Sequence, residues 1–198
     1  MAVAEQVEAR SQSEVAYARI LERIVSLEMP PGSVVNEARL RDELGIGRTP
    51  IREALQRLAR ENLVKSVPHR GTFVTDVNLT DLARITEVRV VLEAHAARLA
   101  TEKLAAADRE SIEELLELLA RGYVTDQRDL MQLDQRIHRT VYRAARNPFL
   151  ESTLERYFNL SLRLWYLVLD RDVELAETMM RRHVIGFESE IRRLLVEG

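Results

Sequence analysis

The distribution of glycine and proline is the feature of this sequence that most restricts its fold. The chain has seven glycines and five prolines, yet only Gly122 and Pro148 lie between Gly71 and Gly186. Because glycine and proline interrupt helices and form turns, this long stretch favours helices over strands. Apolar residues recur there at helical spacing, which predicts helices over about 80–104, 108–121, 127–145, 148–169 and 173–196.

The first third of the chain has a different pattern. Apolar spacing predicts a helix over 13–28 and a short one over 37–44. Gly45 and Gly47 allow a tight turn, after which Thr49 as N-cap and Pro50 at the first helical position predict a helix to about Asn62. Two short strands, 63–67 and 71–75, follow. We therefore predict a mainly α protein, with a winged helix-turn-helix over 1–76 and an antiparallel all-α bundle over 77–198.

Composition narrows the class of protein further. The chain has no cysteine, so any metal site must use histidine and carboxylate ligands. The first residues are polar, and no apolar run is long enough to span a bilayer, so we expect a cytoplasmic protein without a membrane segment. The formal net charge is -3, but residues 39–70 carry eight basic and four acidic side chains. This local excess of positive charge indicates a nucleic-acid partner.

The helix that starts near residue 49 is the candidate DNA-reading element. Arg48 and Arg52 lie one turn apart, and arginine can bond both O6 and N7 of guanine. Thr49 and the amides at the helix start suit a phosphate. The predicted hairpin tip would enter the minor groove or contact the backbone through His69, Arg70 and Gly71.

A second candidate site lies in the predicted bundle. Asp134 and His138 are four residues apart, so they share one helix face and could bind a divalent ion, with His183 as a third ligand. The same spacing is typical of a salt bridge. A metal-dependent hydrolase built on these residues is one alternative function, and a helical protein-docking module is another. The sequence has no recognisable nucleophile motif, phosphate loop or dinucleotide fingerprint, so we predict that it is not an enzyme.

The N-terminal residues resemble the winged helix of GntR-type regulators. The similarity lies in residues 45–55, Leu58, Leu63-Val64 and 70–74. It implies that Arg48, Arg52, His69 and Gly71 contact DNA and that the protein binds a palindrome of double-stranded operator DNA as a homodimer. The sequence departs from the family at Ala38, where many relatives have a DNA-contacting arginine. Arg39 is adjacent and is our candidate in its place.

The C-terminal residues are similar to the FadR-type helical effector domain, which is called FCD. The similarity lies in 86–93, 134–138, 147–150 and 180–183. It implies that Asp134, His138 and His183 hold Zn, Ni or Mn, and that Arg89 binds the carboxylate of a small organic acid. Arginine suits that role because its planar fork pairs with both carboxylate oxygens.

This second resemblance has one departure. The family has a further histidine about twenty residues before the position of His183, whereas 162–166 contains none, and the segment around 169–172 is short by about one helix. Either a true deletion leaves the metal site incomplete, or residues are missing from the sequence at this junction. We favour the second alternative, because deleting a packed helix would open the core. His95 matches no motif, and we interpret it as structural.

Together these observations predict a ligand-responsive transcription regulator, and we expect a repressor. In the mechanism we expect, the ligand binds between the bundle helices and shifts the two winged helices of a dimer relative to each other. Because half-sites on DNA have a fixed spacing, such a shift removes one or both winged helices from the DNA grooves.

Overall fold

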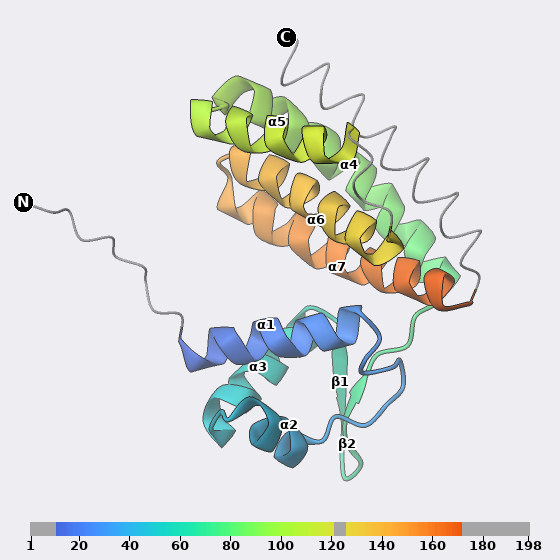
Figure 1. The fold of residues 1–198 in the computed structure, drawn as a ribbon. Coiled ribbons are helices and arrows are strands. Elements are labelled where there is room, and N and C mark those ends of the chain that lie inside the picture. Colours follow the sequence, from blue (N-terminus) through green and yellow to red (C-terminus); the bar gives the residue numbers. More distant parts are fainter. Residues whose placement is uncertain (1–10, 121–125, 172–198) are drawn as a thin grey trace, which may run out of the picture. The chain divides into compact units, whose positions relative to one another are not determined.

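The computed structural model describes residues 11–120 and 126–171, which belong to two compact units, Met1–Val77 and Asn78–Gly198 (Figure 1). The N-terminal unit contains α1 (Gln12–Val25), α2 (Glu37–Leu44), α3 (Arg48–Arg60), β1 (Val64–Val67) and β2 (Gly71–Val74). The C-terminal unit contains α4 (Leu79–Lys103), α5 (Ala106–Ala120), α6 (Gln127–Ala144) and α7 (Pro148–Arg171). In the part of the chain that the structure describes, no helix is long and apolar enough to cross a membrane.

In the N-terminal unit, helix α1 packs against α3. Ser11 and Glu14 form a capping box that satisfies amides at its start. The buried residues Ala16, Ile20 and Ile24 repeat at helical spacing and face α3. The helix ends at Val25, three residues before the predicted end, because Leu27 adopts a φ of 65°.

The turn between α2 and α3 depends on Gly45. Its φ of 65° places it in the left-handed region, and its N–H donates to Arg41 O at 2.9 Å, which ends α2. Gly47 has an ordinary φ of -63° and is the N-cap of α3. The prediction of Thr49 as N-cap is therefore wrong by two residues. Pro50 falls in the third helical position instead, where its missing N–H costs nothing because that amide has no partner inside the helix.

The wing is an antiparallel hairpin in which Val64 pairs with Val74 and Val67 with Gly71. A third extended segment lies along the other edge of β2, which the sequence did not predict. Val35 N donates to Thr72 O at 2.8 Å, and Val74 N donates to Ser33 O at 2.9 Å. This pairing ties the chain before α2 to the base of the wing.

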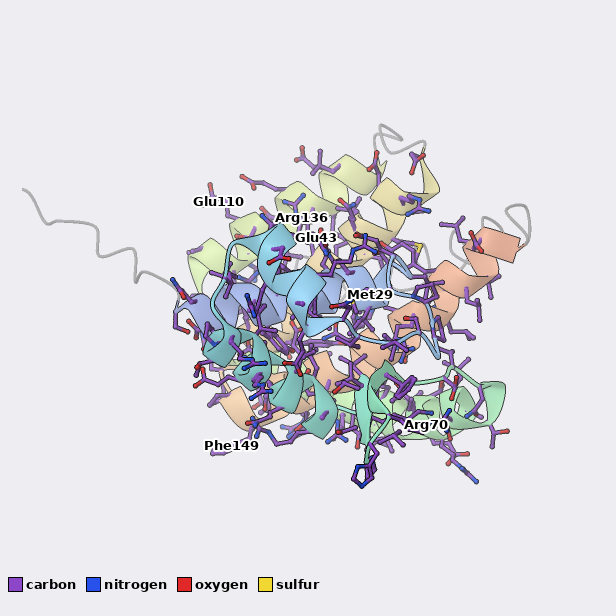
Figure 2. All side chains as sticks on the ribbon, turned by 90° about the horizontal axis from the view of Figure 1, so that it is seen from below. Met29, Glu43, Arg70, Glu110, Arg136 and Phe149 are labelled. Atoms are coloured by element: carbon purple, nitrogen blue, oxygen red, sulfur yellow. The ribbon has the colours of Figure 1, made fainter. Side chains whose placement is uncertain are left out.

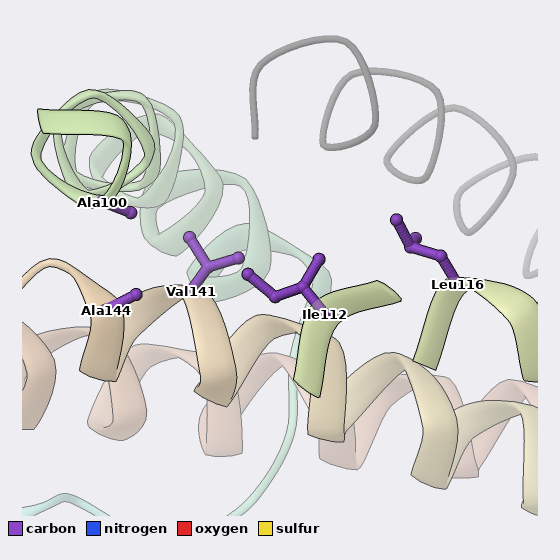
Figure 3. Close-up of a cluster of buried hydrophobic side chains, with 5 residues drawn as sticks. All are labelled: Ala100, Ile112, Leu116, Val141 and Ala144. Atoms are coloured by element: carbon purple, nitrogen blue, oxygen red, sulfur yellow. The ribbon is translucent and has the colours of Figure 1, made fainter. Parts of the chain in front are cut away.

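The C-terminal unit is a helical bundle in which α6 contacts α4, α5 and α7 (Figure 1). The predicted helices over this region agree with the observed ones to within a few residues, and the mainly α fold is confirmed. Part of the core joins α4, α5 and α6 through small and branched side chains (Figure 3), namely Ala100, Ile112, Leu116, Val141 and Ala144. The helix predicted over 173–196 lies outside the described residues.

Candidate DNA-binding surface and sensor site

The start of α3 presents the predicted DNA-contacting side chains to solvent. Arg48 and Thr49 are the first two residues of the helix, Arg52 follows one turn later, and all three are exposed. The N-cap Gly47 makes no side-chain hydrogen bond to the first turn, in contrast to the caps of α1 and α2. The amide groups of this turn carry the positive end of the helix dipole, and the N-cap residue offers them no side-chain acceptor.

Two of the predicted arginines are paired with carboxylates of their own unit. Arg52 Nε donates to Glu37 Oε2 at 3.2 Å. Arg39 Nε donates to Glu43 Oε1 at 2.6 Å, and this hydrogen bond raises the pKa of Arg39. Glu43 also pairs with Arg23, and the bonds from Arg39 and Arg23 lower its pKa. A phosphate or a base must compete with these carboxylates for the two arginines.

The tip of the wing carries the other predicted contacts. His69 has a φ of 60° and Gly71 a φ of 101°, so the turn has two residues in the left-handed region. His69, Arg70 and Gly71 are exposed, and Figure 2 labels Arg70 on this hairpin. Val74, at the base of the hairpin, is fully buried, so the wing is anchored in the core while its tip remains accessible.

In the C-terminal unit, Arg89 of α4 lies in a largely buried cluster of polar side chains. Its Nε and Nη2 donate to Glu93 Oε1 at 3.0 and 2.6 Å. The hydroxyl of Tyr142, from α6, donates to the same oxygen at 2.6 Å. Burial, the largest single influence, would lower the pKa of Arg89, but the charges and hydrogen bonds of Glu93 and Tyr142 together outweigh it and the pKa is raised. The guanidinium also lies 5.0 Å from the centre of the Phe158 ring.

Asp134 and His138 lie side by side in the same unit. His138 Nε2 is 3.6 Å from Asp134 Oδ1, and the two residues are only 1% and 3% exposed. The other ring nitrogen, Nδ1, is 3.3 Å from the hydroxyl of Tyr142, so the cluster is continuous with Arg89 and Glu93. Burial raises the pKa of Asp134 to about 7, against the opposing charge of Arg89.

Among the described residues, the Asp134 carboxylate and the His138 imidazole are suited to binding one divalent cation. Zinc ligands lie about 2.0–2.2 Å from the metal. Asp134 Oδ1 and His138 Nε2 are 3.6 Å apart, so both atoms can reach one ion. Within 11–120 and 126–171 there is no group of three metal-binding side chains, and His183 lies outside these residues. The stretch 162–166, where the family histidine was expected, lies inside α7 and has Arg163 fully buried.

Several members of the cluster were not predicted. Glu93 lies in the segment 86–93 that resembles the FCD domain, but the resemblance assigns it no role, and neither Tyr142 nor Phe158 was predicted. A spacing signal was present for Glu93 and Tyr142. Glu93 is four residues from Arg89 on a helix, and Tyr142 is four residues from His138. His95 is exposed, with Nδ1 3.2 Å from Arg98 Nη2.

In this chain a winged helix-turn-helix is joined to a helical unit that contains a buried polar cluster. Residues 12–74 match the family described as bacterial regulatory proteins, gntR family, and residues 84–170 match the FCD domain. The chain belongs to this GntR family and carries the FCD domain. Members of the family are transcription regulators, so the prediction that the chain is not an enzyme is confirmed.

Individual relatives agree with this assignment. An uncharacterized HTH-type transcriptional regulator of Agrobacterium vitis, from the TAR-I ttuE-ttuC′ intergenic region, is 30% identical over 146 residues, 70% of this chain and 84% of the relative. The probable D-xylose utilization operon transcriptional repressor of Paenarthrobacter nicotinovorans is 35% identical over 134 residues, 66% of this chain and 58% of the relative. The structure of E. coli McbR/YncC has the same fold, with a TM-score of 0.73 at 23% identity over 96% of this chain and 93% of that one.

Proposed function

We propose that this regulator is a repressor that binds a palindromic operator as a homodimer and responds to a small organic acid. The observation that carries the proposal is the exposed set of Arg48, Thr49 and Arg52 at the uncapped start of α3. In this proposal the two arginines contact base edges in the major groove, and Thr49 with the first-turn amides binds a phosphate. His69, Arg70 and Gly71 extend this surface along the wing. Arg39 is an additional backbone contact.

In the C-terminal unit, we propose that Arg89 binds the carboxylate of the acid. The planar guanidinium is suited to a bidentate pair, and the aromatic face of Phe158 beside it limits the approach of water. Asp134 and His138, with His183, would hold a divalent ion such as Zn, Ni or Mn. When bound, the ion would supply a Lewis-acid contact for an oxygen of the ligand.

The link to DNA binding follows from the connection between the units. Only four residues, 75–78, separate the end of β2 from the start of α4. A change in the position of Arg89 or Glu93 on α4 therefore acts on a helix that is joined almost directly to the wing. In a dimer, such a change alters the spacing of the two recognition helices, which must match half-sites about one helical turn apart.

The test is a titration of the protein into a labelled duplex that carries the upstream region of its own gene, at two salt concentrations. Arg48→Ala and Arg52→Ala should each weaken specific binding by about 1–3 kcal/mol. Arg98→Ala, an exposed arginine on α4, is the matched control and should bind like the wild type. A reporter driven from the same region should be derepressed by the first two variants only. Weak, sequence-independent binding that neither variant changes would reject the recognition helix and favour the protein-docking alternative.

A further inference from the structure

The carboxylate of Glu93 already occupies the hydrogen-bonding edge of Arg89. One oxygen, Oε1, accepts from Nε at 3.0 Å and from Nη2 at 2.6 Å, and the Tyr142 hydroxyl donates to the same oxygen at 2.6 Å. The side chains of Arg89 and Glu93 are 12% and 22% exposed, and Tyr142 is 1% exposed. The Nε and Nη2 edge of the guanidinium, which a bound organic carboxylate could use for a bidentate pair, is therefore already bonded to one oxygen of Glu93.

The pair differs from an ordinary surface ion pair on a helix. Exposed ion pairs four residues apart on a helix contribute little to stability, because water screens their charges. Here both charges are shielded from water, and a hydroxyl from α6 adds a third hydrogen bond to the same oxygen. Glu93 is therefore held in place by two helices, so its removal from Arg89 requires a ligand that can replace these contacts.

We propose that Glu93 is an internal competitor for the effector: it occupies Arg89 in the ligand-free protein, and the carboxylate of the acid must displace it. The proposal rests on the proposed role of Arg89 in effector binding. A second carboxylate on the same Nε and Nη2 edge would compete for the same N–H donors and would add a like charge beside Glu93. Binding therefore moves the Glu93 side chain away from Arg89 and breaks its hydrogen bond with Tyr142.

This displacement has two consequences for the sensor. The affinity for any acid is lowered by the cost of releasing Glu93, so an acid with a second anchoring group is favoured over a simple monocarboxylate. The release also removes a contact between α4 and α6, because Glu93 and Tyr142 belong to these two helices. Effector binding at Arg89 is thereby coupled to α4, the helix that follows the wing.

The test measures acetate binding, with acetamide as the uncharged control of the same shape. The full chain is labelled with ¹⁵N on arginine, and the Nε–H signal of Arg89 is followed during the titration. Glu93→Gln keeps the size of the side chain and removes its charge, so it should lower the Kd for acetate by about tenfold. Glu87→Gln, the same change at an exposed position of α4, should leave the Kd unchanged. Arg89→Gln has no such signal, so its acetate binding is measured by isothermal titration calorimetry and should be abolished.

A fourth variant separates competition from a purely structural role. Tyr142→Phe removes the hydroxyl that fastens Glu93 but changes no charge, and it should lower the Kd less than Glu93→Gln does. If Glu93 only stabilises the bundle, Glu93→Gln and Tyr142→Phe will lower the thermal midpoint and leave the Kd as in the wild type, which overturns the proposal while Arg89 remains the binding residue. If acetate perturbs Arg89 in none of the proteins, both the role of Arg89 and the competition are wrong.

Discussion

At the scale of single residues, the two glycines between α2 and α3 have different roles. Gly45 has a φ of 65° and no atom within 4 Å of the position of an added Cβ, so only backbone strain opposes a side chain there. Gly47 is extended, and an added Cβ would meet only ordinary contacts with Pro50, the nearest at 3.8 Å. The turn thus requires glycine at position 45. At position 47 it does not, and the effect of glycine there is that α3 has no side-chain cap.

Substitutions at these positions should change stability in opposite directions. Gly45→Ala should lower the free energy of unfolding by about 1–2 kcal/mol, because a left-handed conformation is unfavourable for alanine. Gly47→Ser should raise it by about 0.3 kcal/mol, because serine can cap α3. Urea denaturation measures both. A loss of stability at Gly47 equal to that at Gly45 would contradict this account of the turn.

Asp134 offers a second prediction at the residue scale. An amide is less costly to bury than a carboxylate, so Asp134→Asn should raise the free energy of unfolding of the metal-free protein by about 1 kcal/mol. Zn²⁺ should stabilise the wild type and have little effect on the variant. The control is Asp129→Asn, an exposed position on the same helix. Equal stabilisation of the wild type and Asp134→Asn by Zn²⁺, measured by thermal unfolding, would remove Asp134 from the metal site.

At the scale of secondary-structure elements, α6 organises the C-terminal unit. The side that carries Asp134 and His138 toward the polar cluster continues along the helix as Val141 and Ala144, which pack in the core with α4 and α5 (Figure 3). The helix is also joined to α7, where Arg139 Nε donates to both oxygens of Glu155 at 3.1 and 3.0 Å. Packing on several sides fixes the orientation of the helix, and with it the orientation of the polar cluster.

Loss of apolar packing on α5 should therefore destabilise the bundle strongly. Ile112 is fully buried between α4 and α6, so Ile112→Ala should cost about 2–5 kcal/mol. The exposed neighbour Glu113 provides the control, since Glu113→Ala should change stability by less than about 0.5 kcal/mol. Chemical denaturation followed by the fluorescence of Trp165 in α7 reports on this unit. Similar effects of the two substitutions would show that α5 does not contribute to a packed core.

At the scale of the whole molecule, charge is divided unevenly along the chain. The net charge is -3, while residues 39–70 have eight basic and four acidic side chains. Arg70 on the wing and Arg136 on α6 are both exposed arginines, one in each unit (Figure 2). Because counterion release depends only on the cations that contact phosphates, the overall charge should not determine the salt dependence of DNA binding.

A salt series tests this division. Operator affinity should fall linearly with salt concentration on a log–log scale, and Arg70→Gln should reduce the slope by about one. Arg136→Gln removes the same charge from the C-terminal unit and should leave the slope unchanged. A smaller slope for Arg136→Gln would instead mean that the FCD domain contacts the DNA backbone.

Local sequence patterns are enough to predict the order of the helices and strands and the class of protein. Scarce glycine and proline after residue 71, and apolar residues at helical spacing, are local signals that survive in any packed arrangement of the helices. The exposure of Arg48, Arg52 and the wing tip can also be predicted from the sequence. It depends mainly on where each residue lies along its helix or turn.

Features that depend on contacts between distant residues could not be predicted from these local patterns. The pairing of 33–35 with β2 depends on hydrogen bonds between residues far apart in the sequence. The meeting of Glu93 with Tyr142, 49 residues apart, likewise depends on how α4 lies against α6. A spacing of four residues places two side chains on one face of a helix, but the neighbouring helix determines whether that face is a solvated surface or a buried polar site.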